Sequence, residues 1–247
     1  MYKNILIISD NPEVALKFEH LLCRKKIKTV KWTFAISPLS QKTNFKFKNK
    51  KRAVCYNLRN HKDVCEIVRK FDLVLSLHCK QLFPVSLIKK VKCINIHPGY
   101  NPINRGWYPH VFSILYDLPI GATIHEIDKK LDHGKIIDRG LVEKYLFDTG
   151  EDLYKRVIKK EFELLNNNLE NIIRGRYTSL QPELEGKVYL KKDFDDLRRI
   201  NLHEKATMLS FINKLRALTN SKYRNAYFIE PKTGKKIFIS LNLVLED

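Results

Sequence analysis

The chain has 247 residues, 44% of them hydrophobic and 11% aromatic, which is enough for one sizeable hydrophobic core or for one domain with a small appendage. No run of about 18 apolar residues occurs, so the sequence excludes a membrane-spanning helix. A formal net charge of +19 indicates an anionic partner, and charge alone does not choose between nucleic acid and a phosphorylated or nucleotide-linked small molecule.

Strands alternate with helices in the first part of the chain. Residues 4–8 (NILII) are typical of a buried parallel strand, and the capping residue Asn11 with Pro12 behind it is typical of a helix start. Further strands are expected at residues 29–36, 53–58, 72–77 and 92–97, and helices at residues 61–70 and 84–90. This alternation predicts an α/β fold with a Rossmann-like, mostly parallel sheet and helices on both faces. No G-x-G-x-x-G motif follows the first strand, which disfavours a nicotinamide-dependent dehydrogenase.

The second part of the chain changes character near residue 176. Before that point, strands are expected at residues 122–127 and 135–142, and a long helix at residues 151–174 that ends at Gly175. After it, the pattern predicts a small C-terminal α+β segment, with a helix at residues 203–218 and a β-hairpin formed by residues 226–230 and 235–245. We therefore expect a Rossmann-like catalytic domain at residues 1–180 and a helix-hairpin region at residues 181–247, which packs on that domain or on a partner subunit.

The cysteines and the N-terminal residues indicate in which cellular compartment the protein is expected. Five cysteines without a C-x-x-C pair favour reduced thiols and no zinc site. The first apolar run is too short for a secretion signal, so a cytoplasmic protein is expected. The densest cationic run, residues 46–52 (KFKNKKR), is interpreted as a solvated loop.

Two polar residues end the strand at residues 92–97. Asn95 and His97 are two positions apart, so both side chains project from the same strand face, and Pro98-Gly99 then turns the chain away. Ligands of doubly wound sheets bind at the carboxyl ends of strands. The pair is therefore a candidate site, although capping or turn roles are an alternative from the spacing alone.

A carboxylate follows about thirty residues later, in the segment Leu131-Asp132-His133-Gly134 between two expected strands. Asp132 is favoured over Asp128 as the working acid because Gly134 permits a tight turn close to a ligand. His125 falls inside an expected strand, where a structural histidine is the favoured interpretation.

These residues resemble the folate-dependent formyltransferases. The carrying motifs are N-I-H-P-G-x-N-P-x-N-R-G-W-Y-P from Asn95 and A-T-I-H-E-I-D-x-x-L-D-H-G from Ala122, and the resemblance is nearest to the sugar N-formyltransferases. It implies that Asn95, His97 and Asp132 are the catalytic set, that N10-formyltetrahydrofolate is the co-substrate and that no metal takes part. It also implies that His78, Gln81, Leu82 and Phe83 form a wall of the pterin pocket, with Asp128 beside the cofactor. The alternative is that this wall is a plain strand-to-helix loop.

The proposed chemistry matches these residue types. An amine attacks the formyl carbon, and the Asn95 amide and protonated His97 could stabilise the negative charge that develops on the formyl oxygen. An imidazole exchanges protons near neutral pH, as the attacking amine and the leaving nitrogen require. Asp132 could hold the imidazole and favour its charged form, or accept the proton of the amine through a water.

The resemblance of the C-terminal segment decides the expected acceptor. The segment is short for the barrel domain of methionyl-tRNA formyltransferases, which remain the alternative, and its sequence resembles the tail of the sugar enzymes. The resemblance implies a dTDP-linked amino-dideoxy sugar as acceptor, dTDP-4-amino-4,6-dideoxyglucose above all, for O-antigen or other surface polysaccharide, and a homodimer with no membrane or nucleic-acid partner. Aromatic side chains could stack on the base and cations meet the diphosphate, and the candidate substrate-binding residues are Trp107, Arg105, Arg216, Lys222, Tyr223 and Asn225. For any one of them, a structural or solvated role is equally open. A basic nucleic-acid-binding protein is the non-enzyme alternative, and it would leave the Asn95, His97 and Asp132 set unexplained.

Overall fold

The computed structural model describes residues 1–40 and 53–246 of the chain. The cationic run at residues 46–52, interpreted above as a solvated loop, lies outside the described residues.

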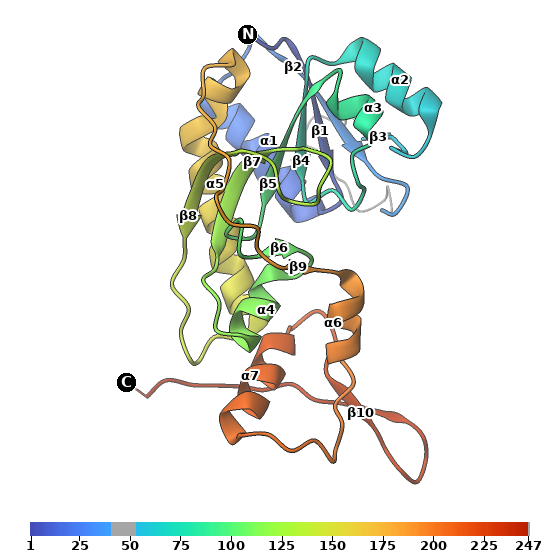
Figure 1. Ribbon diagram of the computed structural model, residues 1–247, viewed down its shortest axis with the longest axis vertical. Coiled ribbons are helices and arrows are strands. Elements are labelled where there is room, and N and C mark those ends of the chain that lie inside the picture. The colour runs from blue at the N-terminus through green and yellow to red at the C-terminus, as the bar shows by residue number, and fades with distance from the viewer. Residues whose placement is uncertain (41–52, 247) are drawn as a thin grey trace. The chain divides into compact units, whose positions relative to one another are not determined.

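A seven-stranded sheet dominates the fold (Figure 1). Its strand order is β3-β2-β1-β4-β5-β7-β8. The strands β3, β2, β1, β4 and β5 pair in parallel, and β7 runs antiparallel to β5. The strands are β1 (Asn4–Ser9), β2 (Lys31–Ile36), β3 (Val54–Cys55), β4 (Leu73–Leu77), β5 (Lys92–His97), β7 (Gly121–Glu126) and β8 (Ile136–Leu141). The prediction of an α/β, mostly parallel Rossmann-like sheet is confirmed.

Helices cover both faces of the parallel part of this sheet. Leu6 and Ile8 of β1 pack in one hydrophobic cluster with side chains of α2 (His61–Lys70) and α3 (Val85–Ile88). Ile5 and Ile7 alternate with them and face the opposite side of the sheet, where Figure 1 shows α1 (Pro12–Lys25). The C-terminal part of α5 (Gly150–Arg174) lies beside α1, where Lys25 Nζ is 3.4 Å from the Glu170 carboxylate. The main elements of the first half therefore follow from buried runs that alternate with capped helices.

The chain separates into two compact units. The first comprises Met1–His97, Thr123–Arg139 and Glu161–Glu183, and the second comprises Pro98–Ala122, Gly140–Lys160 and Leu184–Asp247. These units interleave along the chain, which is a different division from one at residue 180. The boundary at residue 180 separates a predicted catalytic domain from a predicted helix-hairpin region. It does not describe these two units and stays a prediction.

The second unit holds most of the remaining elements of the fold. They are β6 (Arg105–Gly106), α4 (Pro109–Leu115), β9 (Val188–Tyr189), α6 (Lys191–Leu197), α7 (Met208–Leu218), β10 (Tyr227–Ile229) and β11 (Lys236–Phe238). β6 pairs with β9, and β10 pairs with β11 as an antiparallel hairpin. Phe112 and Tyr189 stack in its core with ring centroids 4.0 Å apart.

Three details differ from the sequence-based expectations. α7 begins at Met208 instead of residue 203, because Thr207 caps it by accepting a hydrogen bond from Ser210 N at 3.2 Å. The second strand of the hairpin ends at Phe238 instead of residue 245. The β6–β9 pair was not expected, since two-residue strands have no periodicity, and a Cβ on Gly106 would lie 2.0 Å from the Tyr189 carbonyl oxygen.

Candidate active site

Four polar side chains converge where β5 ends, and we call them the polar cluster: Asn95, His97, His125 and Asp132. Asn95 Nδ2 donates to Asp132 Oδ1 at 2.9 Å, and His97 Nδ1 lies 3.5 Å from Asp132 Oδ2. His125 Nε2 lies 3.2 Å from Asn95 Nδ2 and 3.5 Å from Asp132 Oδ1. His97 and His125 are buried, with side chains 5% and 2% exposed, and the side chain of the half-buried Asp132 is 9% exposed. One carboxylate thus faces an amide and two imidazoles, with little of its side chain in contact with water.

Hydrogen bonding determines how His125 carries its proton. Its Nδ1 is 2.7 Å from the main-chain oxygen of Glu126, and a carbonyl oxygen only accepts, so Nδ1 carries the proton. In the neutral ring, Nε2 then accepts a hydrogen bond from Asn95 Nδ2. His125 therefore helps to orient the Asn95 amide, a more specific role than the structural histidine expected from its place in a strand.

Register and turn geometry bring the polar cluster together. β5 and β7 pair so that Asn95 lies opposite His125. Asp132 follows in the β7–β8 turn with φ of 44°, in the left-handed region that non-glycine residues rarely adopt. A Cβ on Gly134 would lie 1.9 Å from the Glu126 carbonyl oxygen, so this glycine is needed where the two arms of the turn approach each other. The sequence suggested that Gly134 permits a turn close to a ligand. In the structure, the close neighbour of Gly134 is the protein's own backbone at Glu126.

The other candidate acid points elsewhere. Asp128 Oδ2 lies 2.6 Å from His133 Nδ1, and its Oδ1 accepts a hydrogen bond from Lys130 N at 2.8 Å. Its side chain is 37% exposed, against 9% for Asp132. The structure therefore brings Asp132, and not Asp128, into contact with Asn95 and His97.

The loop after β4, residues 78–84, contains the expected cofactor-binding residues, and we call it the β4 loop. His78 is paired with Glu161 of α5 at 2.9 Å. The Gln81 side chain is held by main-chain groups, since its Oε1 accepts from Leu58 N at 2.9 Å and its Nε2 donates to Tyr56 O at 3.0 Å. Phe83 packs against the cluster of β1, α2 and α3, whereas Leu82 is 73% exposed. Of these four residues, Leu82 is thus the one that presents most of its side chain to solvent.

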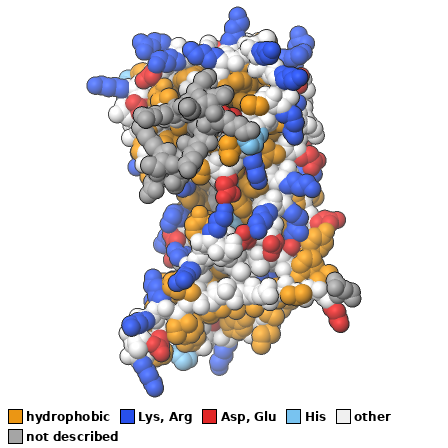
Figure 2. Space-filling model, turned by 180° about the vertical axis from the view of Figure 1, so that it is seen from behind, with side chains coloured by type: hydrophobic (Ala, Val, Ile, Leu, Met, Phe, Trp, Pro, Cys, Tyr) orange, Lys and Arg blue, Asp and Glu red, His pale blue; other side chains and the backbone are white. Residues whose placement is uncertain are grey.

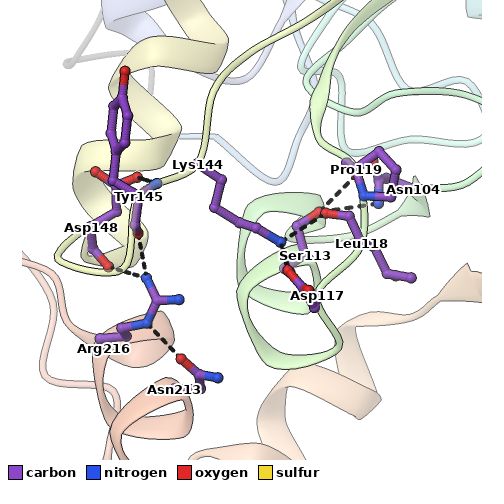
Figure 3. A network of polar contacts seen from close by, with 10 residues as sticks. All are labelled: Asn104, Ser113, Asp117, Leu118, Pro119, Lys144, Tyr145, Asp148, Asn213 and Arg216. Carbon is purple, nitrogen blue, oxygen red and sulfur yellow. Dashed lines mark hydrogen bonds and ion pairs between the residues drawn. The ribbon is translucent and has the colours of Figure 1, made fainter. Parts of the chain in front are cut away.

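Arg216, Arg105 and Trp107 all belong to the second unit. Arg216 is buried and donates to the main-chain oxygens of Tyr145 and Asp148 at 3.0 and 2.9 Å, as Figure 3 shows. Arg105 is also buried, with Nη1 3.2 Å from the Gly186 oxygen. Trp107 N donates to Tyr189 O at 2.7 Å, and the residue as a whole is half-buried. The two arginines therefore hold backbone segments together.

The remaining candidates lie between α7 and β10, again in the second unit. Asn225 Nδ2 donates to Leu218 O at 3.0 Å. Lys222 and Tyr223 donate their main-chain N–H groups to Asn220 Oδ1 at 2.9 and 3.1 Å. Tyr223 is 66% exposed, so its ring is available to stack on a planar ligand.

Sequence reasoning missed two buried carboxylates near the β4 loop. Asp10, 6% exposed, accepts hydrogen bonds from Ser37 N at 2.9 Å and Lys80 N at 2.7 Å. Glu161, 1% exposed, pairs with His78. The available signal was a charged residue on the apolar side of a helix, because Glu161 follows Val157 by four positions and precedes Leu165 by four.

Two absences hold for the residues that the structure describes. In residues 1–40 and 53–246, no three His, Cys, Asp or Glu side chains are grouped so that they could hold a metal ion. No helix within those ranges has both the length and the apolar character needed to cross a bilayer.

Comparison with known proteins identifies the class of enzyme. Residues 23–169 match the formyl transferase family, and residues 193–245 match the N-formyltransferase dimerization C-terminal domain. The chain belongs to the formyl transferase family and is a formyltransferase.

Sugar N-formyltransferases are among the proteins to which it is similar. It is 48% identical over 180 residues to the dTDP-4-amino-4,6-dideoxyglucose formyltransferase of Mycobacterium tuberculosis, which covers 73% of this chain and 76% of that one. A solved 4-N formyltransferase from Francisella tularensis superposes with a TM-score of 0.91 at 37% identity over 99% of both chains. A sugar N-formyltransferase from Shewanella superposes with a TM-score of 0.89 at 34% identity, again over 99% of both chains.

Proposed function

We propose that the chain transfers a formyl group from N10-formyltetrahydrofolate to the amine of a dTDP-linked amino-dideoxy sugar, dTDP-4-amino-4,6-dideoxyglucose. The observation that carries this proposal is the buried polar cluster, in which Asp132 contacts both Asn95 and His97. The 48% identity to an enzyme named for that sugar supports the acceptor.

The polar cluster can perform the transfer with its own side chains. The sugar nitrogen forms a bond to the formyl carbon, and the bond from that carbon to the folate nitrogen breaks. Asn95 Nδ2, by turning one N–H from His125 Nε2 to the formyl oxygen, and a protonated His97 would stabilise the charge that develops there, with Asp132 opposite Nδ1 favouring the charged imidazole. His97 Nε2 would then exchange protons between the amine, which loses one, and the folate nitrogen, which gains one.

The donor supplies the electrophilic formyl carbon, and the residues present fit it. An amide, an imidazole and a carboxylate are the groups that acyl transfer needs, and they lie at the carboxyl end of β5, where ligands of such sheets bind. The neighbouring β4 loop offers main-chain groups and the exposed Leu82 side chain as a wall for a flat pterin ring. Asp128 would lie beside the donor instead of taking the amine proton.

The second unit would bind the nucleotide and a second copy of the chain. Tyr223 and Trp107 would stack on the base, while Lys222 and Asn225 would contact the polar groups of the nucleotide. Arg105 and Arg216, both buried, would act by stabilising the second unit, through the main-chain oxygen of Gly186 and those of Tyr145 and Asp148. The match to a dimerization domain supports a homodimer. We further propose a cytoplasmic enzyme that serves O-antigen or another surface polysaccharide.

A turnover assay tests the proposal. N10-formyltetrahydrofolate is supplied with dTDP-4-amino-4,6-dideoxyglucose or with a dTDP-3-amino sugar, and release of tetrahydrofolate is followed by absorbance. We expect turnover with the 4-amino sugar and its loss in His97→Ala. The control is His61→Ala, the same substitution at an exposed position on α2.

Three outcomes would change the assignment. Preference for the 3-amino sugar would overturn the acceptor but not the reaction. No turnover with any sugar, together with formylation of initiator methionyl-tRNA, would favour the tRNA enzyme, which the +19 charge suits. An unaffected His97→Ala variant would contradict the role of the polar cluster.

A further inference from the structure

Glu161 is a buried carboxylate that the proposed reaction does not use. It lies on α5 in a row with Val157 and Leu165, both fully buried, and is itself 1% exposed. A charge in such a place is costly unless it is paired and hydrogen-bonded. An apolar residue would suit this row of the helix better, so the carboxylate needs a reason beyond packing.

Its partner is His78, the first residue of the β4 loop. His78 Nε2 lies 2.9 and 3.0 Å from the two oxygens of Glu161, and its own side chain is 11% exposed. A carboxylate accepts hydrogen bonds, so Nε2 carries the proton and donates it to this pair of oxygens. The backbone of His78 has φ of 58°, a conformation that a histidine keeps only when its surroundings hold it.

A second carboxylate fixes the same loop from the end of β1. Asp10 Oδ2 accepts a hydrogen bond from Lys80 N at 2.7 Å, while Asp10 N is 3.4 Å from the carbonyl oxygen of His78. Asp10 Oδ1 accepts from Ser37 N and Ser40 Oγ after β2. Glu161 of α5 therefore holds the β4 loop through the His78 side chain, and Asp10, directly after β1, holds it through the main chain.

The anchored residues begin directly after β4, and His97 is the last residue of the neighbouring strand β5. β4 and β5 pair in parallel with Ser76 opposite Asn95 and Leu77 opposite Ile96. His78 comes directly after Leu77 in the chain, and His97 comes directly after Ile96. A shift of the β4 loop would therefore move the proposed wall of the donor site relative to the groups that act on the formyl carbon.

We propose that Glu161 is a positioning residue for the formyl donor: through His78 it holds the β4 loop at the spacing from His97 that donor binding requires. This inference rests on the proposed function, because it assumes that the donor binds against the β4 loop. Glu161 does not touch the donor itself, so its loss weakens donor binding and leaves the chemistry of the polar cluster in place.

The experiment compares Glu161→Gln with the wild type in the turnover assay, varying donor and sugar separately. Loss of the charge-assisted hydrogen bond is expected to raise the KM for the donor about tenfold, with kcat and the KM for the sugar within about twofold of wild type. The matched control is Glu170→Gln, the same change on the exposed side of α5, where Glu170 makes surface pairs with Lys25 and Arg174.

A second pair of variants separates positioning from stability. His78→Gln keeps an N–H donor for Glu161 and is expected to retain most donor affinity, whereas His78→Leu raises the donor KM as Glu161→Gln does. Hydrogen exchange of the peptide spanning residues 78–84 should speed up in Glu161→Gln and His78→Leu but not in Glu170→Gln.

The assay distinguishes a failure of the proposed function from a failure of the positioning role of Glu161. A wild type that does not use the folate donor overturns the proposed function. A wild type that does use it, with an unchanged donor KM in Glu161→Gln or with donor and sugar KM raised alike, overturns the positioning role.

Discussion

Asp132 owes its place in the polar cluster to an uncommon backbone conformation. With φ of 44° it turns its carboxylate toward Asn95 and His97, while Asp128, four positions earlier, is directed to His133. The two acids lie in the same connection between β7 and β8, and its backbone conformation directs their side chains to different partners. Burial then favours Asp132 for proton chemistry, because a carboxylate in a dry setting interacts strongly with a neighbouring imidazole.

Replacing each acid by its amide should separate their roles. We expect Asp132→Asn to lower kcat by about 100-fold or more, because the charge that favours protonated His97 is lost. Asp128→Asn keeps the polar cluster intact and should leave kcat within about fivefold of wild type, with any loss appearing in the donor KM. Steady-state kinetics with both substrates varied gives the answer, and an equal loss of kcat in both variants would contradict the assignment.

His125 should act through Asn95. His125→Leu removes one of the two acceptors of the Asn95 amide and leaves only Asp132, so the amide is held less firmly and kcat is expected to fall about tenfold. His125→Gln retains a side-chain oxygen and should lose less. Thermal unfolding of both variants is the companion measurement, because a kcat difference between variants of equal Tm cannot come from stability.

At the scale of elements, α5 carries carboxylates of two kinds. Glu161 is buried on its apolar side, whereas Glu151 lies in its first turn and contacts the segment after α7. Glu151 Oε2 accepts a hydrogen bond from Ser221 N at 2.6 Å, and Oε1 accepts one from Ser221 Oγ at 2.9 Å. The Ser221 main-chain hydrogen bond first, and then Lys155 and the Ser221 hydroxyl, lower the pKa of Glu151 from 4.5 to about 2.

This pKa shift predicts an acid-dependent contribution to stability. A lowered folded-state pKa means that the contribution is fully present above pH 4.5 and disappears as the pH falls toward 2. After allowance for solvent screening, Glu151→Gln should cost about 1 kcal/mol of unfolding free energy at pH 7 and much less at pH 3. Urea unfolding at pH 7 and pH 3 measures this loss of unfolding free energy, with Glu170→Gln as control. An equal loss at both pH values would contradict the link between the Glu151 pKa and stability.

At the scale of the whole molecule, two surface properties stand out. Lys and Arg side chains are spread over the face drawn in Figure 2, and hydrophobic side chains show in the lower part of that view. Among the exposed hydrophobic residues of the C-terminal segment are Leu209, Ile237, Phe238 and Val244. A two-stranded hairpin such as β10–β11 is marginal by itself, so its exposed apolar residues are expected to be covered by another surface.

The expected cover is a second copy of the chain, in line with the match to a dimerization domain. We expect the wild type to sediment at twice the chain mass and Ile237→Asp to sediment as a monomer at micromolar concentration, because a buried charge in an apolar interface is costly. Lys232→Asp in the hairpin turn is the control. A wild type that sediments as a monomer would remove this interface from the proposal.

The sequence by itself determined the class of fold and the reaction type. Apolar runs such as residues 5–8 (ILII), which are typical of a buried strand, and the capped helix His61–Lys70 indicated the alternating pattern. The spacing of Asn95, His97 and Asp132 carried the resemblance to formyltransferases, which the family match confirms. Both can be read along the chain, the strands and helices from local periodicity and the reaction type from two sequence motifs.

Only the tertiary structure decided which distant residues meet. It paired His125 with Asn95 across two antiparallel strands, selected Asp132 over Asp128 through one backbone turn, and placed Glu161 against His78. It also buried Arg105 and Arg216, whose sequence context was equally compatible with solvent or a diphosphate. The physical reason is that side-chain pairing and burial depend on strand register and helix packing, which no local pattern encodes.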